Sequence, residues 1–298
     1  MKKTFPKLFI TLFFAIATKG ALAQQVSVQA QSAETPKANS LAPMPTSNGK
    51  LTLDPNSAES KAEIAKQLAN PLANMISMPT QWEFSRGMGK NQAGSDQTLL
   101  LQPVAPFSLS GGDIFLVRPI IASTRLVNVD GNSGYGVSGV TIESFYAPNT
   151  GSSWIWGVGP YASSPSGNSG LYGTQQTGAG VTAVVLNRDG GFTYGLLGFQ
   201  SWNVGGNPSF GTQNNLFGQP FLVYTNSEAW SFGANMQANY NYDARRTTNP
   251  LNLTVGKLEV FDGVPVSFSA GPIYYLSNTP GGPSGWGARA TLTMVFLK

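Results

Sequence analysis

The stretch from Trp230 to Tyr242 constrains the fold more than any other part of the chain, because its side chains alternate strictly in character. One set is small or polar, and the other is apolar: Trp230, Phe232, Ala234, Met236, Ala238, Tyr240 and Tyr242. A period of two is typical of a β-strand with one apolar face. From Trp230 to Tyr240 such a strand is about 33 Å long. Tilted by about 45°, it covers about 23 Å, close to the apolar band of an outer-membrane barrel. A strand of a large soluble sandwich is the alternative at this point.

The connections between the candidate strands decide between these two folds. Strands are predicted at 76–88, 97–109, 113–126, 135–147, 153–162, 178–188, 191–203, 216–226, 229–242, 250–261, 264–276 and 285–297. Tight turns rich in Asn, Asp and Gly alternate with longer connections, which are 89–96, 127–134, 163–177, 204–215, 243–249 and 277–284. Short periplasmic turns and longer extracellular loops interleave in this way in outer-membrane barrels. We therefore predict an all-β fold, an antiparallel transmembrane β-barrel of about 12 strands over residues 76–298.

Residues 1–23 have the features of a secretory signal peptide. Lysines near the start precede an apolar run over residues 8–17, and Ala-Leu-Ala at 21–23 matches a cleavage site. The apolar run is too short to span a membrane as a helix. We expect cleavage after Ala23, export through the inner membrane and localisation in the outer membrane.

The chain is basic only because of this leader. Of its 18 Lys and Arg residues, four lie in residues 1–23, and the other 14 balance 14 Asp and Glu residues. A neutral mature chain offers no electrostatic basis for binding nucleic acid, so no such partner is expected. Charged residues make up 11% of the sequence, which fits a barrel whose outer face meets lipid.

Two short segments separate the leader from the first strand. Residues 24–57 are rich in Gln, Ser, Ala, Pro and Asn, a composition typical of a disordered linker. Residues 58–75 are predicted to contain a short helix, which begins after Asn56 or Ser57 as N-cap and ends before Pro71. This helix either packs at the barrel mouth or acts as a plug or gate in the lumen. The candidate plug residues on its apolar face are Ile64, Leu68 and Leu72.

The chain has no Cys and no His. It therefore cannot form disulfides or thiolate metal sites, and it lacks the commonest general base and metal ligand. The spacing Asn128-x-Asp130-x-Asn132 is that of a calcium loop, but Ser133 stands where an EF-hand needs Gly and Gly139 where it needs the distal Glu. A barrel hydrolase, which is the enzyme alternative, would need a Ser activated by a His. We predict no enzyme activity, no cofactor and no metal site.

A set of short motifs carries a family resemblance. The motifs are Ile64-Ala-Lys-Gln-Leu-Ala-Asn-Pro71 leading into Ile76-Ser-Met-Pro79, then Leu101-Gln-Pro-Val-Ala-Pro-Phe107, Trp154-Ile-Trp-Gly-Val-Gly-Pro160, Gly178-Ala-Gly-Val-Thr-Ala-Val-Val185, Gln219-Pro-Phe-Leu222 and Pro283-Ser-Gly-Trp-Gly287. Over about residues 60–298, the chain resembles bacterial outer-membrane proteins labelled as transporters, meta-pathway phenol-degradation channels or "neuromedin U". The resemblance implies an outer-membrane barrel with a channel role and no settled solute. One departure is the C-terminus, where Leu297 and Lys298 follow Phe296, whereas such barrels commonly end on an aromatic residue.

If the apolar set of each strand faces lipid, the polar set faces the lumen. An Arg or Lys on the lipid face near the midplane costs about 2–4 kcal/mol, so charged side chains are expected inside. They form either an internal network that fills the barrel or a pore lining that selects solutes by charge and size. The predicted pore-lining residues are Glu83, Arg118, Glu143, Asn235, Gln237, Asn239 and Arg289.

The predicted function is an outer-membrane channel for passive uptake of small solutes, including aromatic or other small organic compounds. Two alternatives stay open: a non-conducting structural barrel, and a secretion or translocator-type barrel with a helix plug. The expected partners are the lipid bilayer, lipopolysaccharide, the outer-membrane assembly machinery and the small solute.

Overall fold

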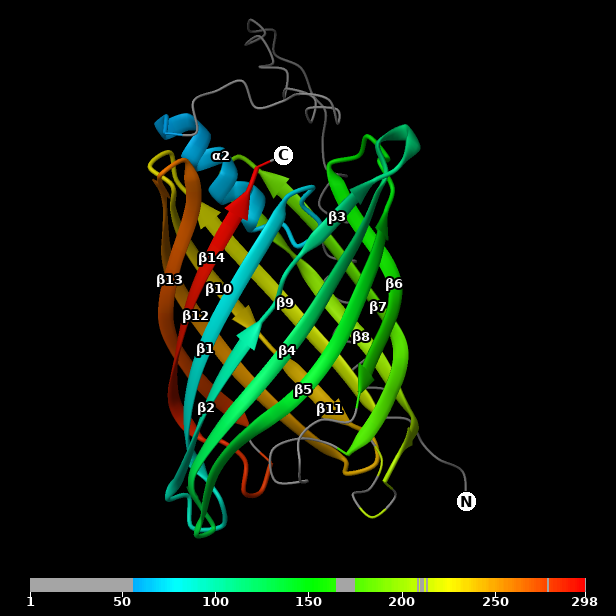
Figure 1. Cartoon of the computed structure of the whole chain (residues 1–298), viewed down its shortest axis with the longest axis vertical. Coiled ribbons are helices and arrows are strands. Elements are labelled where there is room, and N and C mark those ends of the chain that lie inside the picture. The colour runs from blue at the N-terminus through cyan, green and yellow to red at the C-terminus, as the bar shows by residue number, and fades with distance from the viewer. Residues whose placement is uncertain are drawn as a thin grey trace, which may run out of the picture. The chain divides into compact units, whose positions relative to one another are not determined.

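The computed structural model describes residues 56–164, 175–207, 209, 212, 214–277 and 279–297. The predicted signal peptide 1–23 and nearly all of the predicted linker 24–57 lie outside these residues. In the described part, antiparallel strands form a closed barrel of 12 strands with two extra strands and one short helix, which confirms the predicted fold class (Figure 1). The elements are α2 (Ala58–Leu68), β1 (Ile76–Met88), β2 (Gly94–Leu101), β3 (Ala105–Ser108), the 3₁₀ turn η1 (Ser110–Gly112), β4 (Ile114–Val129), β5 (Asn132–Ala147), β6 (Trp154–Ser164), β7 (Gln176–Asp189), β8 (Phe192–Gly206), β9 (Asn215–Thr225), β10 (Trp230–Met236), β11 (Ala238–Asn241), β12 (Arg246–Phe261), β13 (Val264–Ser277) and β14 (Gly285–Phe296).

The two extra strands arise because two barrel strands are interrupted without losing their register. β2 and β3 both pair with β4, and the gap between them contains Pro103, which has no N–H to donate to a sheet. β10 and β11 both pair with β12, and in the gap the Gln237 N–H donates to the Pro250 carbonyl at 2.9 Å. Each interrupted pair therefore occupies the place of one strand in the barrel.

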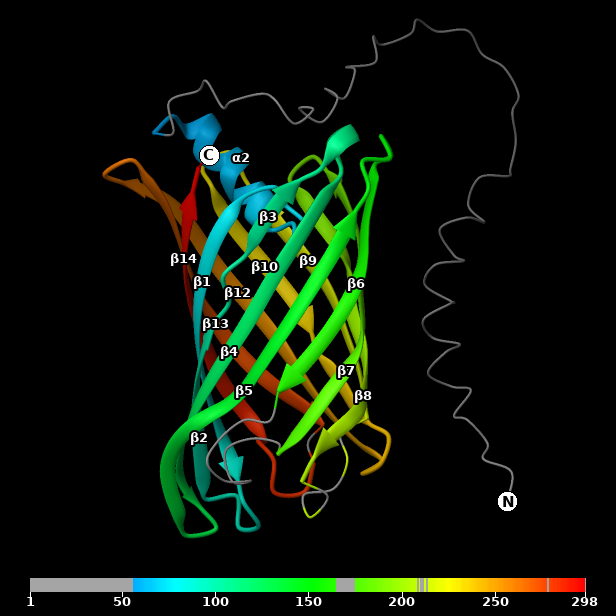
Figure 2. The same ribbon diagram turned by 45° about the vertical axis from the view of Figure 1, so that its right-hand side comes forward.

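The first and last strands close the barrel. β1 pairs antiparallel with β14, from Ile76 opposite Phe296 to Phe84 opposite Ala288. The other strands pair with their neighbours in sequence, and Figure 2 shows the same continuous wall from a second side. Closure leaves the described strands without an open sheet edge, which is the condition for strands to cross a lipid bilayer with their backbone groups paired.

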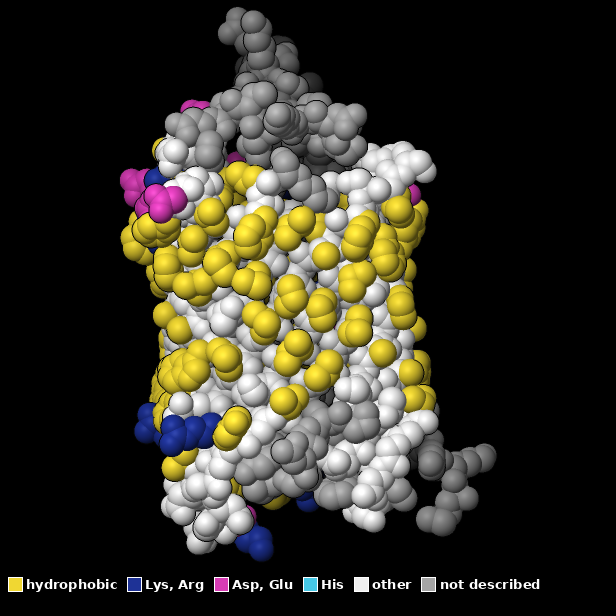
Figure 3. All heavy atoms as spheres, viewed as in Figure 1, with side chains coloured by type: hydrophobic (Ala, Val, Ile, Leu, Met, Phe, Trp, Pro, Cys, Tyr) yellow, Lys and Arg dark blue, Asp and Glu magenta, His cyan; other side chains and the backbone are white. Residues whose placement is uncertain are grey.

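The outer face of the barrel is apolar, as the alternation of β10 predicts. Trp230 and Phe232 point outward and are 38% and 48% exposed, whereas Ser231 and Asn235 line a cavity inside the barrel. Figure 3 shows hydrophobic side chains over the wall and charged side chains near its two ends. This distribution matches a barrel that presents an apolar band to lipid.

The connections differ in part from their predicted lengths. The connections predicted as tight turns all lie at one end of the barrel, where the described chain also begins and ends (Figure 1). At the other end, the predicted long connection 127–134 is wrong, because only Asp130 and Gly131 separate β4 from β5. Both residues have positive φ angles, 49° and 82°, as a tight type I′ hairpin turn requires. The Asp130 carboxylate accepts the Lys90 N–H at 2.7 Å, so the spacing that resembles a calcium loop belongs to a hairpin.

The helix α2 is built as its sequence predicts. The Ser57 hydroxyl accepts a hydrogen bond from the Ser60 N–H at 3.2 Å and caps the first turn. After α2, the Asn70 side chain accepts the Leu72 N–H at 2.8 Å and turns the chain toward β1. Within the described residues, no helix combines the length and the apolar character that a membrane span requires.

The turn before β4 carries a prediction for pH. Hydrogen bonds from the Tyr146 hydroxyl and then from the Asn149 N–H lower the pKa of Asp113 from its usual value of 3.8. Because the Asp113 carboxylate stays ionised below its usual pKa of 3.8, these hydrogen bonds are present above that pH and persist somewhat below it. They are lost only as the pH falls through the lowered pKa. We expect an NMR titration of the Asn149 amide to show its midpoint below pH 3.8. A midpoint at or above that pH would contradict the assignment, and Asp113→Asn should abolish the transition.

Candidate functional site

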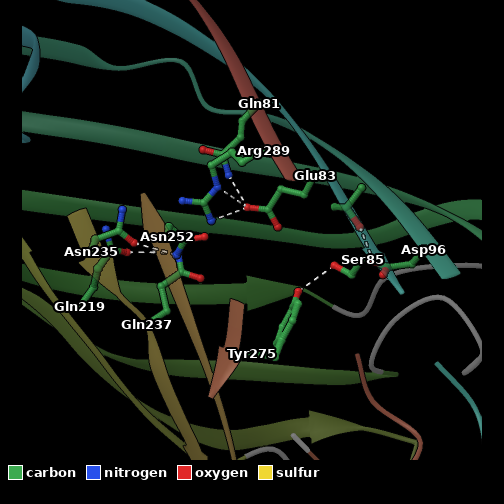
Figure 4. Close-up of polar contacts among 11 residues, drawn as sticks. Gln81, Glu83, Ser85, Asp96, Gln219, Asn235, Gln237, Asn252, Tyr275 and Arg289 are labelled. Atoms are coloured by element: carbon green, nitrogen blue, oxygen red, sulfur yellow. Dashed lines mark hydrogen bonds and ion pairs between the residues drawn. The ribbon is translucent and has the colours of Figure 1, made fainter. Parts of the chain in front are cut away.

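One ion pair in the lumen joins the first and last strands of the barrel, where the wall closes. Glu83 on β1 lies opposite Arg289 on β14, and Arg289 donates from Nε and Nη2 to Glu83 Oε1 at 2.9 and 2.5 Å. The Gln81 side chain donates to the same oxygen at 2.7 Å (Figure 4). Arg289 is only 7% exposed. The two predicted pore-lining charges therefore neutralise each other and are fixed in place.

A second ion pair lies on the neighbouring part of the wall. Arg118 on β4 is directly opposite Glu143 on β5, and Arg118 donates to Glu143 Oε2 from Nε at 3.1 Å and from Nη2. Glu143 is 2% exposed, and Arg118 reaches the central cavity. The sequence places both residues inside on charge more than on pattern, and the structure adds that they are partners.

Amide side chains cover another part of the lumen, on β9 to β12. Asn252 donates from its amide to Asn235 at 2.9 Å, and Gln237 donates to Gln219 at 3.4 Å (Figure 4). Asn239 follows Gln237 on the same face of the interrupted strand and is exposed. The predicted residues Asn235, Gln237 and Asn239 thus share one side of the wall.

Several lumen residues were not singled out from the sequence. Tyr275 on β13 forms a hydrogen bond with Ser85 on β1 at 2.7 Å (Figure 4). On the β6–β9 side, the rings of Tyr161, Phe199 and Phe217 stack with centroid distances of 4.3 and 4.9 Å. A period of two is the signal that assigns such residues to the inner face, but the strand with Phe199 is apolar on both faces. Its inward side became clear only from its pairing.

The three candidate plug residues occupy two different parts of the barrel. Ile64 is 1% exposed and belongs to a cluster with Ala229, Leu258 and Val295, against which Leu68 also packs. Leu72 is 2% exposed and belongs to a second cluster whose members include Leu116, Phe145 and Leu186. The first cluster involves β12 and β14, whereas the second involves β4, β5 and β7, and β5 lies across the barrel from β12 in the strand order. The segment 58–75 therefore extends across the mouth of the lumen.

Two ion pairs tie the helix to the rim. Lys61 Nζ lies 2.7 Å from Glu259 Oε2 on β12, and Arg188 Nη2 on β7 lies 3.2 Å from Glu63 Oε1. The side chains are between 25% and 42% exposed. Partly exposed pairs of this kind are close to surface pairs, which contribute about 0.2–1 kcal/mol each and are screened by salt.

Reversing one of these charges should loosen the helix. Lys61→Glu would bring two carboxylates together, and we expect a several-fold faster proteolytic cleavage within 58–75, since about 1 kcal/mol is involved. The double variant Lys61→Glu with Glu259→Lys restores opposite charges and should return the cleavage rate toward that of the wild type. If the double variant is cleaved as fast as the single one, the pair does not hold the helix.

A cavity of about 360 Å³ lies between the segment 58–75 and the wall of the lumen. Its lining includes Leu68 and Met75 from the segment before β1, and side chains from strands on several sides of the barrel. The segment 58–75 thus borders a space whose other lining comes from the barrel wall. Clusters of three or more metal-ligating side chains are absent from the described residues.

The comparisons with known proteins show the fold. An outer membrane channel from Pseudomonas putida F1 is 13% identical, with a TM-score of 0.59, and the match covers 74% of this chain and 96% of that one. The NanC porin is 9% identical with a TM-score of 0.46, over 74% and 98% of the two chains. Outer membrane phospholipase A from Escherichia coli is 11% identical with a TM-score of 0.44, over 79% and 98%. No protein-family model and no curated protein sequence matches the chain. The resemblance to an outer-membrane barrel is confirmed at the level of fold, and the family labels stay predictions.

Proposed function

We propose that this chain is an outer-membrane channel for small solutes, closed at its periplasmic mouth by the segment 58–75, which we call the plug segment. The observation that carries the proposal is the cavity of about 360 Å³ inside the barrel, whose lid contributes no strand to the wall. The segment is held to the wall by side-chain packing, two partly exposed ion pairs and a hydrogen bond from Asn74 to Ser108. It can therefore leave without breaking the backbone pairing of the barrel. The predicted plug residues Ile64, Leu68 and Leu72 are then the contacts that must separate during opening.

Passive transport suits the chemistry of the lumen better than catalysis does. Both internal acid–base pairs are mutually neutralised (Glu83 with Arg289, and Arg118 with Glu143). The full sequence has no His to activate a serine, which argues against a barrel hydrolase. Small organic solutes, aromatic compounds among them, are the class that the resemblance and the cavity size favour, since ligand pockets begin at about 300 Å³.

The proposed setting is the outer membrane, reached after cleavage behind Ala23. The bilayer and lipopolysaccharide would contact the apolar outer face, and the outer-membrane assembly machinery would insert the barrel. Support for this setting comes from the outward apolar side chains and the closed antiparallel wall. The connections at the end with α2 are those predicted as tight turns, and outer-membrane barrels place their short turns on the periplasmic side, which supports a periplasmic position for this end.

Single-channel recording in planar bilayers tests the proposal. We expect brief conductance steps from the wild type, and steps that become longer in high salt as the two rim pairs are screened. Protein whose fold is verified by heat-modifiable gel mobility should be used throughout. If neither the folded wild type nor variants with a weakened plug contact conduct, the channel is excluded and the non-conducting structural barrel is the remaining interpretation. Release of a pore block only when residues 24–75 are removed would favour the translocator-type barrel.

A further inference from the structure

The cavity under the plug segment has one wall of hydroxyl groups. These come from four consecutive barrel strands, β10, β12, β13 and β14, and the residues are Ser231, Thr254, Ser267, Ser269 and Thr293. Glycines at 233 and 256 lie among them and leave room beside the hydroxyls. A hydroxyl rotates freely and serves as donor or acceptor. This wall can therefore satisfy several polar groups of a ligand without imposing a charge.

Amides extend the polar lining. Gln102, Gln219 and Asn235 also border the cavity, and Asn235 accepts the amide of the fully buried Asn252. The oxygen of Asn252 has no hydrogen-bond donor among the described residues. Figure 4 shows Gln219, Asn235 and Asn252 close together on neighbouring strands. This side of the lumen thus offers amide donors and acceptors to the cavity, whereas the Asn252 oxygen lies behind the lining.

Most of the remaining lining is apolar, with Gln67, Asn70 and Ser77 as further polar side chains near the segment 58–75. Leu197, Phe221 and Val223 face the cavity from β8 and β9, and Leu68 and Met75 face it from the plug segment. A ligand that fits both sides must have a polar edge and an apolar face. The Ser231 hydroxyl already shares a hydrogen bond with Thr225 at 2.9 Å. Burying a purely apolar ligand against the other wall hydroxyls would take them from water without supplying a hydrogen-bond partner, which is unfavourable.

The charge of the lining is balanced. Among the described residues that border the cavity, Arg118 is the one with a formal charge, and its guanidinium is already paired with Glu143. A charged ligand would lose its hydration without gaining a free counter-ion, and that loss is large in a confined site. The lining therefore favours a neutral molecule.

We infer that this cavity is a binding site for a small, uncharged, hydroxyl-rich ring of the monosaccharide class. The inference rests on the proposed function, because it names the solute that the channel would hold behind its plug. The ring hydroxyls bond to the serine, threonine and amide side chains, and the C–H face of the ring packs against Phe221 and its apolar neighbours. A volume of about 360 Å³ accommodates one such ring and excludes long oligomers.

Equilibrium dialysis with the full-length protein in detergent tests the inference without requiring conductance. The probes are glucose, glucosamine and glucuronate, which share one ring and differ in charge. We expect glucose to bind at millimolar concentrations and the two charged sugars to bind at least about tenfold more weakly. Equal binding of a charged sugar, tighter binding of phenol than of glucose, or no binding of glucose would each overturn the inference.

Two variants locate the site. Thr254→Val removes one cavity hydroxyl with little change of shape, and we expect about a fivefold weaker binding of glucose, the usual effect of one lost hydrogen bond. Thr80→Val is the matched control, because Thr80 lies in a groove on the outer face of β1. The affinity of this variant for glucose should equal that of the wild type. Equal affinities of the two variants would place glucose elsewhere and overturn the inference.

Conductance of the same samples separates the two proposals. A protein that conducts but does not bind glucose overturns the binding site and leaves the channel. A protein that binds glucose with the expected variant pattern, yet never conducts, overturns the channel and leaves the cavity as a binding site.

Discussion

Replacing Leu72 with alanine is expected to open the channel. Leu72 is 2% exposed in a cluster from the far wall of the barrel, and removal of a buried leucine side chain costs about 2–5 kcal/mol. Because Leu72 lies outside the strands, this loss falls on the docking of the plug segment and not on the barrel. At about 1.4 kcal/mol per factor of ten, the ratio of docked to undocked plug should fall at least about 30-fold. The measurement is the open probability of single channels in planar bilayers.

Leu253→Ala is the matched control for this experiment. Leu253 is 47% exposed on the outer face of β12, so the same truncation there should leave the open probability unchanged. An unchanged open probability in Leu72→Ala, from protein that shows normal heat-modifiable mobility, would mean that the plug segment does not limit conduction. A substitution of Gly157 tests the same contact from the barrel side, because a Cβ atom at this position would lie 3.1 Å from the methyl groups of Leu72.

Removing the charge of Glu143 is expected to have the largest effect on the barrel itself. Glu143→Gln leaves the Arg118 guanidinium without its counter-ion in a site where the carboxylate is 2% exposed. Removing one partner of a buried ion pair lowers the free energy of unfolding by about 3–5 kcal/mol. We therefore expect a clear loss of stability against urea, measured in detergent micelles. The unpaired cation beside the cavity should also shift the reversal potential of open channels toward anion selectivity.

Two further variants make this result interpretable. Glu228→Gln changes an exposed carboxylate in the turn between β9 and β10 and should leave both stability and selectivity unchanged. The double variant Arg118→Gln with Glu143→Gln removes both charges and should restore the wild-type selectivity. Anion selectivity that persists in the double variant would show that Arg118 is not its source.

The residue pattern predicts which face of a strand is buried only where the two faces differ. The alternation from Trp230 to Tyr242 assigned its outward and inward sides correctly because aromatics and amides occupy opposite faces. The strand that contains Phe199 and Trp202 is apolar on both sides. There the lumen holds the aromatic stack of Tyr161, Phe199 and Phe217, so polarity cannot distinguish lumen from lipid.

Pairing between distant strands is beyond the reach of local patterns. Glu83 and Arg289 were each predicted to face inward, but their contact depends on the register of β1 against β14, which closure of the whole barrel determines. The helix amphipathicity likewise identified Ile64 and Leu68 as an apolar face without indicating the wall they contact. The roles of these residues as pore lining and plug stay predictions, and the conductance experiments address them.

The position of Ile64 links sealing of the barrel to the completion of its assembly. Its cluster includes Val295 on β14 and Leu258 on β12, so the pocket for the helix does not exist until the last strand has paired with β13. A segment that precedes every strand in the chain must therefore wait for the final one before it can dock. Contacts this distant in sequence form late, because chain closure has to come first. A barrel interrupted before closure would stay unsealed, and docking of the helix would mark the finished molecule.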